Sequence, residues 1–336
     1  YYLSLVTKGE EHKHYADLTK QAAYFALSWY YLWDVPFAPG QMLGDIGLKT
    51  RGWGNVSVEN NHIDVFVFDA QGTYLFMKSA NAEELTRNNY RISFSELSEG
   101  NYTFLAWGGL SEDFRLSGLD ARSLEFVPGK TRVEDIYLDL HAAEDGVCRK
   151  QLHPLWYAEP LNISYNPRSG RNIHTVSLIK NTNHFHFSLQ EEGTPSSGAV
   201  GELLPYTFEI ISIGYERYDW KNTPVGTQRI ATVCYEIETD DFANTSAQLV
   251  TGRLLEEKES RILYVRSTRN TNLLWKFDLG ELLSRTCPDG MSLQEYLDRQ
   301  DTWSLIFNYK GDGIESFIAV SVSINGWTLW LQDVEA

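Results

Sequence analysis

The sequence predicts an all-β protein, built as two tandem antiparallel β-sandwich domains with a few short helices. Thr, Val, Ile and Tyr recur in short runs separated by turn residues, which is typical of strands. No β-α-β rhythm is present, so a parallel α/β sheet is not expected. The chain of 336 residues is long enough for two ordinary domains, and its 43% hydrophobic and 22% charged content indicates a globular protein.

The stretch from His62 to Gly109 organises the first half. In His62–Asp69, apolar side chains occupy both faces of a strand, because Val65 and Phe66 alternate with further apolar residues. A strand that is apolar on both faces is expected to be covered on both sides. We expect Asp69–Gly72 to form a tight turn and Tyr74–Met77 to return antiparallel to the first strand.

A second apolar strand is predicted at Gly100–Gly109, where a pair of glycines ends the run. The two strands together predict a core that contains Val65, Phe66, Phe104 and Trp107.

The first sixty residues give a weaker signal. We expect a short helix or an irregular segment, then a strand at about 26–33, then a Gly- and Pro-rich loop over 34–61. Later, the polar stretch from His141 to Pro154 contains Gly146 and predicts a domain boundary. The expected domains are residues 1–148 and 149–336.

The second half repeats the pattern of strands and turns. Two short helices are expected, one after Asp278 and one after Ser292, where Ser292 and Glu295 form a capping box. The chain is expected to end on two strands, Trp303–Tyr309 and Phe317–Leu331. The other candidate strands are Trp156–Ile163, Thr175–Ile179, His184–Leu189, Tyr206–Ile213, Arg229–Glu238, Ala247–Leu255 and Arg261–Ser267.

Charge and motifs argue against several classes of function. The net charge of −16 disfavours nucleic acid and anionic membrane surfaces as partners. The sequence contains no Gly-x-Ser-x-Gly, His-Glu-x-x-His or Walker motif. The adjacent carboxylates Asp240–Asp241 and Glu256–Glu257 would point to opposite faces of a strand, so neither pair is a natural acid/base dyad. No catalytic residue, cofactor site or metal site is predicted.

Histidines and cysteines support this conclusion. His184 and His186 would share the solvent face of a strand without an identifiable third ligand, and His12 and His14 are interpreted in the same way. Three cysteines, Cys148, Cys234 and Cys287, are odd in number and far apart. They are expected to be buried free thiols, with one disulfide left open.

Five motifs carry a resemblance to a known family. The first half contains "VxVFDxxGxY" at Val65–Tyr74 and "GxYxFxAWGG" at Gly100–Gly109. The second half contains "VSLIKNTNHFHFSL", "QEYLDRQDTWSLIF" and "SINGWTLWLQDVEA". Over roughly residues 60–336, their order and spacing resemble the FimB-like fimbrillin family, the anchor and tip subunits of Bacteroidota fimbriae.

The resemblance implies a non-enzymatic subunit with two transthyretin-like sandwiches. It implies other fimbrial subunits as partners, strand exchange as the mode of assembly, and the outer membrane or fimbrium as the location. A lipid on a Cys upstream of Tyr1 would anchor the chain, and host or bacterial surface ligands are further partners. Since family members that form the stalk are cut after an Arg in an N-terminal loop, Arg51 is the candidate processing site, although we expect an uncleaved chain.

Trp327 and Trp330 are candidate subunit contacts, because they lie three residues apart on a strand and therefore face opposite sides. An alternative function is a surface glycan-binding protein that uses exposed aromatic side chains as stacking platforms. A third is a secreted hydrolase whose carboxylates converge only in the fold. A row of exposed aromatics, a paired sheet edge or a cleft with two carboxylates would distinguish these alternatives.

Overall fold

The computed structural model is predominantly β, as predicted, with a few short helices. No described helix is both long and apolar enough to cross a membrane. All described residues lie in one compact unit, 44–336. They are residues 45–50, 62–88, 90–118, 125–141, 145–169, 173–191, 206–239, 245–257, 260–267, 273–311 and 317–330. The strand predicted at 26–33 lies outside them.

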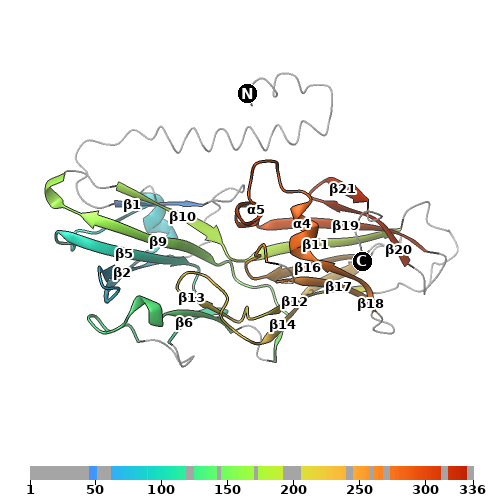
Figure 1. Ribbon diagram of the computed structural model, residues 1–336. Coiled ribbons are helices and arrows are strands. Elements are labelled where there is room, and N and C mark those ends of the chain that lie inside the picture. The colour runs from blue at the N-terminus through green and yellow to red at the C-terminus, as the bar shows by residue number, and fades with distance from the viewer. Residues whose placement is uncertain are drawn as a thin grey trace, which may run out of the picture. The chain divides into compact units, whose positions relative to one another are not determined.

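A seven-stranded sheet contains the organising stretch (Figure 1). Within it, β2 and β5 are neighbours and pair antiparallel from Ile63↔Gly108 to Asp69↔Tyr102. Six consecutive residues of β2 are buried, so this strand is covered on both faces as predicted. In spatial order the strands are β3 (Tyr74–Asn81), β2 (His62–Asp69), β5 (Gly100–Gly108), β9 (Trp156–Tyr165), β10 (Ile173–Lys180), β1 (Asp45–Thr50) and β4 (Arg91–Ser93).

The predicted turn between β2 and β3 is confirmed. Asp69 Oδ1 accepts hydrogen bonds from the backbone N–H groups of Gln71 and Thr73, at 2.9 and 2.8 Å. Gly72 has φ +78°, which a residue without Cβ adopts easily. The turn therefore follows from local sequence alone.

A three-stranded sheet packs with the seven-stranded one. It has the order β13 (Arg217–Asp219), β7 (Tyr137–Leu140) and β6 (Phe114–Ser117), and η1 (Val133–Asp135) precedes β7. One core cluster joins Phe66, Trp107 and Tyr157 of the large sheet with Phe114 and Leu138 of the small one. The predicted core is confirmed, since Val65, Phe66, Phe104 and Trp107 are all buried. We call these two sheets the first lobe.

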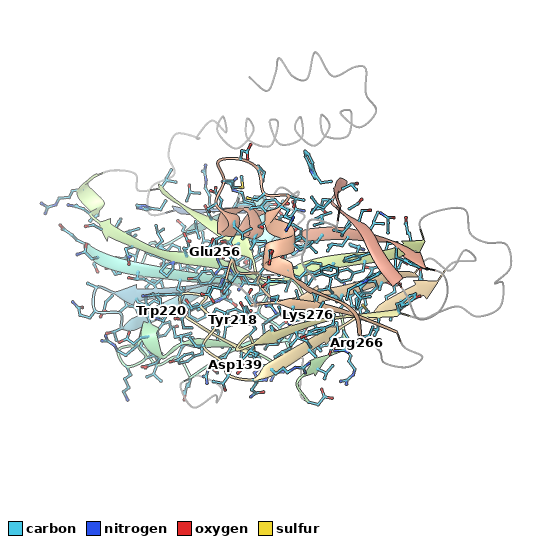
Figure 2. The ribbon with its side chains drawn as sticks, turned by 45° about the vertical axis from the view of Figure 1, so that its right-hand side comes forward. Asp139, Tyr218, Trp220, Glu256, Arg266 and Lys276 are labelled. Carbon is cyan, nitrogen blue, oxygen red and sulfur yellow. The ribbon has the colours of Figure 1, made fainter. Side chains whose placement is uncertain are left out.

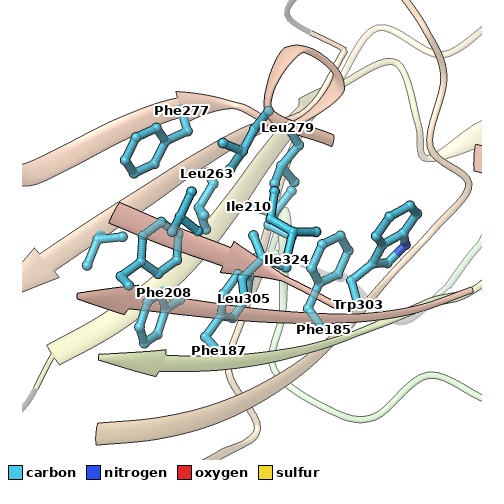
Figure 3. Packing of buried hydrophobic residues seen from close by; sticks show 14 of the residues in the cluster. Phe185, Phe187, Phe208, Ile210, Leu263, Phe277, Leu279, Trp303, Leu305 and Ile324 are labelled. Atoms are coloured by element: carbon cyan, nitrogen blue, oxygen red, sulfur yellow. The ribbon is translucent and has the colours of Figure 1, made fainter. Parts of the chain in front are cut away.

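The other two sheets form the second lobe, and they share a second core cluster (Figure 3). Phe187 of the six-stranded sheet stacks on Phe208 of the five-stranded sheet, with ring centroids 4.7 Å apart. The six-stranded sheet has the order β15 (Glu236–Thr239), β16 (Thr245–Thr251), β11 (Asn183–Glu191), β19 (Thr302–Gly311), β20 (Phe317–Ile324) and β21 (Trp327–Trp330). The five-stranded sheet has the order β18 (Leu273–Asp278), β17 (Ile262–Ser267), β12 (Tyr206–Ile213), β14 (Arg229–Val233) and β8 (Val147–Cys148).

The predicted division at 148/149 is wrong, because the seven-stranded sheet takes strands from both sides of it. β9 pairs with β5 over Gly100↔Tyr165 to Gly108↔Trp156, and β10 pairs with β9. Apart from β8, the chain enters the second lobe only after Lys180. The polar stretch 141–154 does mark a change of sheet, since β8 pairs with β14, but turn composition does not show which strands pair beyond it.

Three short helices accompany the strands in the described part of the chain. Both predicted helices are present, α4 (Leu279–Ser284) capped by Asp278 and α5 (Leu293–Arg299) capped by Ser292. A third, α3 (Ala82–Arg87), was not predicted. Its capping box joins Asn81 and Glu84, a local signal that the sequence does contain. A short 3-10 turn, η2 (Pro167–Ser169), separates β9 from β10.

Candidate functional site

The last strand, β21, forms one edge of the six-stranded sheet. It pairs with β20 from Ser321↔Trp330 to Ile324↔Trp327, and no described strand pairs with its other side. An edge strand of this kind presents unpaired backbone N–H and C=O groups to an incoming strand. The arrangement offers a place where a neighbouring chain could add a strand.

A tight hairpin positions β21, which corrects the single strand predicted over 317–331. Asn325 and Gly326 both have positive φ, 48° and 87°, as a two-residue hairpin turn requires. The Asn325 side chain also accepts a hydrogen bond from the backbone N–H of Ser304, at 2.8 Å. An Asn-Gly pair is a strong hairpin signal, so this turn was visible in the sequence and was missed.

Trp327 is the most exposed feature of this edge. Its partner Ile324 is buried, so the register places Trp327 on the core-side face of the sheet. Its side chain is nevertheless 61% exposed, because it lies at the edge of the sheet. The register pairs Trp330 with Ser321, and the side chain of Trp330 lies outside the described residues. Of the two candidate contacts, the structure therefore describes the side chain of Trp327 alone.

The candidate processing site, Arg51, lies outside the described residues. It directly follows β1, whose last residue is Thr50. β1 lies between two strands of the first lobe, parallel to β10 over six residue pairs and antiparallel to β4 over three. A cut after Arg51 would therefore separate β1 from the chain that follows it.

Among the described residues, no group of metal-ligating side chains includes His184 or His186. Among the described residues, the metal-ligating side chains that converge are instead Glu112, Asp113 and His153. Asp113 Oδ2 lies 2.7 Å from His153 Nδ1 and accepts the His153 backbone N–H at 2.9 Å. The Lys150 ammonium contacts Asp113 Oδ1 and already supplies the opposite charge, so this cluster is best explained as a structural ion pair around a buried carboxylate. It connects the segment before β6 to the segment before β9. The connected residues Asp113 and His153 are 40 positions apart, so no local sequence pattern indicated the contact.

The Asp113 cluster predicts sensitivity to acid. Burial raises the pKa of this carboxyl, but hydrogen bonds from Lys150 and His153 outweigh burial and hold the pKa below its ordinary value of 3.8. A carboxyl with a lowered folded-state pKa stabilises the fold above its unfolded-state pKa and loses that contribution as pH falls through the folded-state value. We expect Asp113→Asn to lower the melting temperature at pH 7 and to reduce the loss that wild type shows between about pH 5 and pH 2.

Thermal melts across that pH range would check this expectation. Glu112→Gln is the matched control, because this exposed neighbour reaches Lys150 only at 3.7 Å. Equal pH profiles for wild type and Asp113→Asn would contradict the assignment.

The three cysteines are free. Cys148 is buried as predicted, whereas Cys234 and Cys287 are only partly covered. Burial raises the pKa of Cys234 to about 12, so this thiol stays protonated at neutral pH. A protonated thiol is a poor nucleophile and a poor metal ligand.

Comparisons with known proteins agree with this architecture. The sequence profile of the fimbrillin-A associated anchor proteins Mfa1 and Mfa2 matches residues 54–333. No curated protein matches the chain.

Solved structures of similar proteins cover most of the chain. A candidate adhesin from Bacteroides ovatus is 28% identical, with a TM-score of 0.74 over 88% of this chain and 96% of that one. A candidate polysaccharide-binding protein from Bacteroides thetaiotaomicron is 24% identical, with a TM-score of 0.73 over 88% and 99%. The fimbrial anchor protein Mfa2 from Porphyromonas gingivalis is 16% identical, with a TM-score of 0.62 over 86% and 99%, and shares the fold. The chain therefore belongs to the family of fimbrillin-A associated anchor proteins and is a fimbrial subunit.

Proposed function

We propose that this subunit ends a fimbrium, as an anchor or a tip, and joins its neighbour through the β21 edge. The observation that carries the proposal is the exposed Trp327 on an edge strand whose outer side no described strand pairs with. An incoming strand would satisfy the open backbone groups of β21, and the indole would add apolar contact area beside them.

The two lobes support this role as a pair of β-sandwiches of the transthyretin-like kind. In each lobe, one core cluster joins two sheets. The buried carboxylates Asp113, Asp139 and Asp298 each pair with a cation, which suits a role in holding the fold rather than in catalysis. We therefore propose a non-enzymatic subunit. In the anchor role, it would lie on the outer face of the outer membrane, attached through a lipid upstream of Tyr1.

Trp327→Ala is expected to reduce incorporation into fimbriae while leaving the fold intact. An exposed edge side chain contributes little to folding, but a large aromatic at the centre of an interface often contributes about 2 kcal/mol or more to binding. Immunogold counts on fimbriated cells would measure incorporation. Ile213→Ala is the matched control, since Ile213 is similarly exposed, at 67%, but lies at the end of β12. Equal incorporation of both variants would rule out the β21 edge.

Cleavage after Arg51 is not expected in a terminal subunit, because the strand β1 would be lost from between β10 and β4. N-terminal sequencing of protein recovered from fimbriated cells would check this. A mature start at Gly52 would make the chain a polymerising stalk subunit instead.

Glycan binding is less well supported. A stacking platform needs several exposed rings, and Trp327 alone among the aromatic side chains that the structure describes is exposed. A glycan array that gives saturable binding abolished by Trp327→Ala would favour this alternative.

A further inference from the structure

The two lobes exchange short strands with each other. Val147 and Cys148 form β8 and pair in parallel with Ala231 and Thr232 of the second lobe. In return, β13, which lies in the second half of the chain, pairs with β7 of the first lobe, from Arg217↔Asp139 to Asp219↔Tyr137. Unfolding either lobe would therefore remove a strand from a sheet of the other.

The direct link between the lobes is short and buried. Only Asn181 and Thr182 separate β10 from β11, and they and Asn183 are all buried. Asn181 donates its backbone N–H to Leu155 O at 2.7 Å, and the Thr182 hydroxyl accepts from Leu155 N at 3.3 Å. Such a short and hydrogen-bonded link restricts rotation of one lobe relative to the other.

A reciprocal amide pair fixes the loop after β13 to this link. Asn181 Nδ2 donates to Asn222 Oδ1 at 2.6 Å, and Asn222 Nδ2 donates to Asn181 Oδ1 at 2.9 Å. Both side chains are buried, so breaking the pair would leave two amides without partners. Arg253 extends the network, donating to Asn222 O at 3.3 Å and forming two bonds to Asp298 of α5.

Apolar and aromatic packing continues through the same region, where Figure 2 labels Tyr218 and Trp220. Val250 of β16 packs in the core cluster of the first lobe, together with Tyr215 and Tyr218. The Tyr157 hydroxyl of β9 donates to Trp220 O at 3.1 Å. The Arg261 guanidinium lies 4.0 Å from the centre of the Tyr215 ring.

We propose that the two lobes unfold as one cooperative unit, and that the Asn181–Asn222 pair and the exchanged strands couple them. In a subunit that ends a fibre, this coupling would let both lobes resist tension together. Only this role in resisting tension rests on the proposed function. The coupling is a property of the isolated chain and is tested without fimbriae.

Hydrogen exchange of the purified chain, followed by mass spectrometry at increasing guanidinium concentration, tests the coupling. Peptides from β2 and β5 report on the first lobe, and peptides from β11 and β19 on the second. In wild type, both sets are expected to lose protection at one midpoint. In Asn222→Gly, the two midpoints are expected to separate by roughly 0.3 M or more.

Glycine suits position 222 because Asn222 has φ +64°, so this substitution removes the amide without straining the backbone. Asn325→Gly is the matched control, at a second Asn with positive φ in the β20–β21 turn, and should keep one midpoint. Should Asn222→Gly fail to fold, Asn181→Ser replaces it. Two midpoints in wild type, or one shared midpoint in the variant, would overturn the proposal.

Discussion

Phe66→Ala is expected to lower the free energy of unfolding by about 3–5 kcal/mol, as deletion of a large buried side chain does. Phe66 lies in β2 and is only 2% exposed. Its ring meets Trp107 edge-on, with centroids 5.7 Å apart, and lies 4.6 Å from Phe126. Alanine would leave a cavity where three aromatic rings meet, and the neighbouring strands could not close it without breaking their pairing.

Chemical denaturation of the purified chain would measure this change. Met77→Ala is the control, because Met77 of β3 is the cross-strand neighbour of Phe66 but is 44% exposed. We expect this control to cost less than about 1 kcal/mol. A similarly small cost for Phe66→Ala would contradict the central place of β2 in the core.

Arg253→Ala is expected to destabilise the chain by about 3–5 kcal/mol, because it removes one partner of a buried ion pair. Arg253 Nε and Nη2 donate to the two oxygens of Asp298 at 2.9 and 2.8 Å. The two side chains are only 14% and 8% exposed. The substitution would leave the Asp298 carboxylate buried, with Gln294 Nε2 as its remaining described side-chain donor, at 2.9 Å.

Arg299→Ala provides the comparison, because Arg299 lies on α5, the helix that also carries Asp298. Arg299 pairs with Glu295 at 2.6 Å, but these two side chains are 29% and 47% exposed, and the pair is expected to contribute less than about 1 kcal/mol. Urea denaturation of both variants would show the difference. Equal destabilisation would mean that water reaches Asp298 and that the pair is not part of the junction between the lobes.

Many of the local elements could be predicted from the sequence. The two-faced apolar pattern of His62–Asp69 predicted a covered strand, and Ser292 with Glu295 predicted the start of α5. These signals act within a few residues, because side-chain alternation and helix capping depend on neighbours in the chain. Two signals of the same kind, Asn81 with Glu84 and Asn325 with Gly326, were also present but were not used.

The pairing of distant segments was decided only by the tertiary structure. Every strand offers the same backbone donors and acceptors, so the choice of partner depends on how whole faces pack rather than on the strand's own sequence. For this reason β9 and β10 join the first lobe, β8 and β13 cross between lobes, and Lys150 and His153 meet Asp113. The sequence by itself determined many of the strands, the burial of β2 and β5, and the family, although β1 lies in the stretch 34–61 that was predicted to be a loop. Which strand lies at an open edge, and which buried side chains hold the lobes together, follows from packing between residues far apart in the chain.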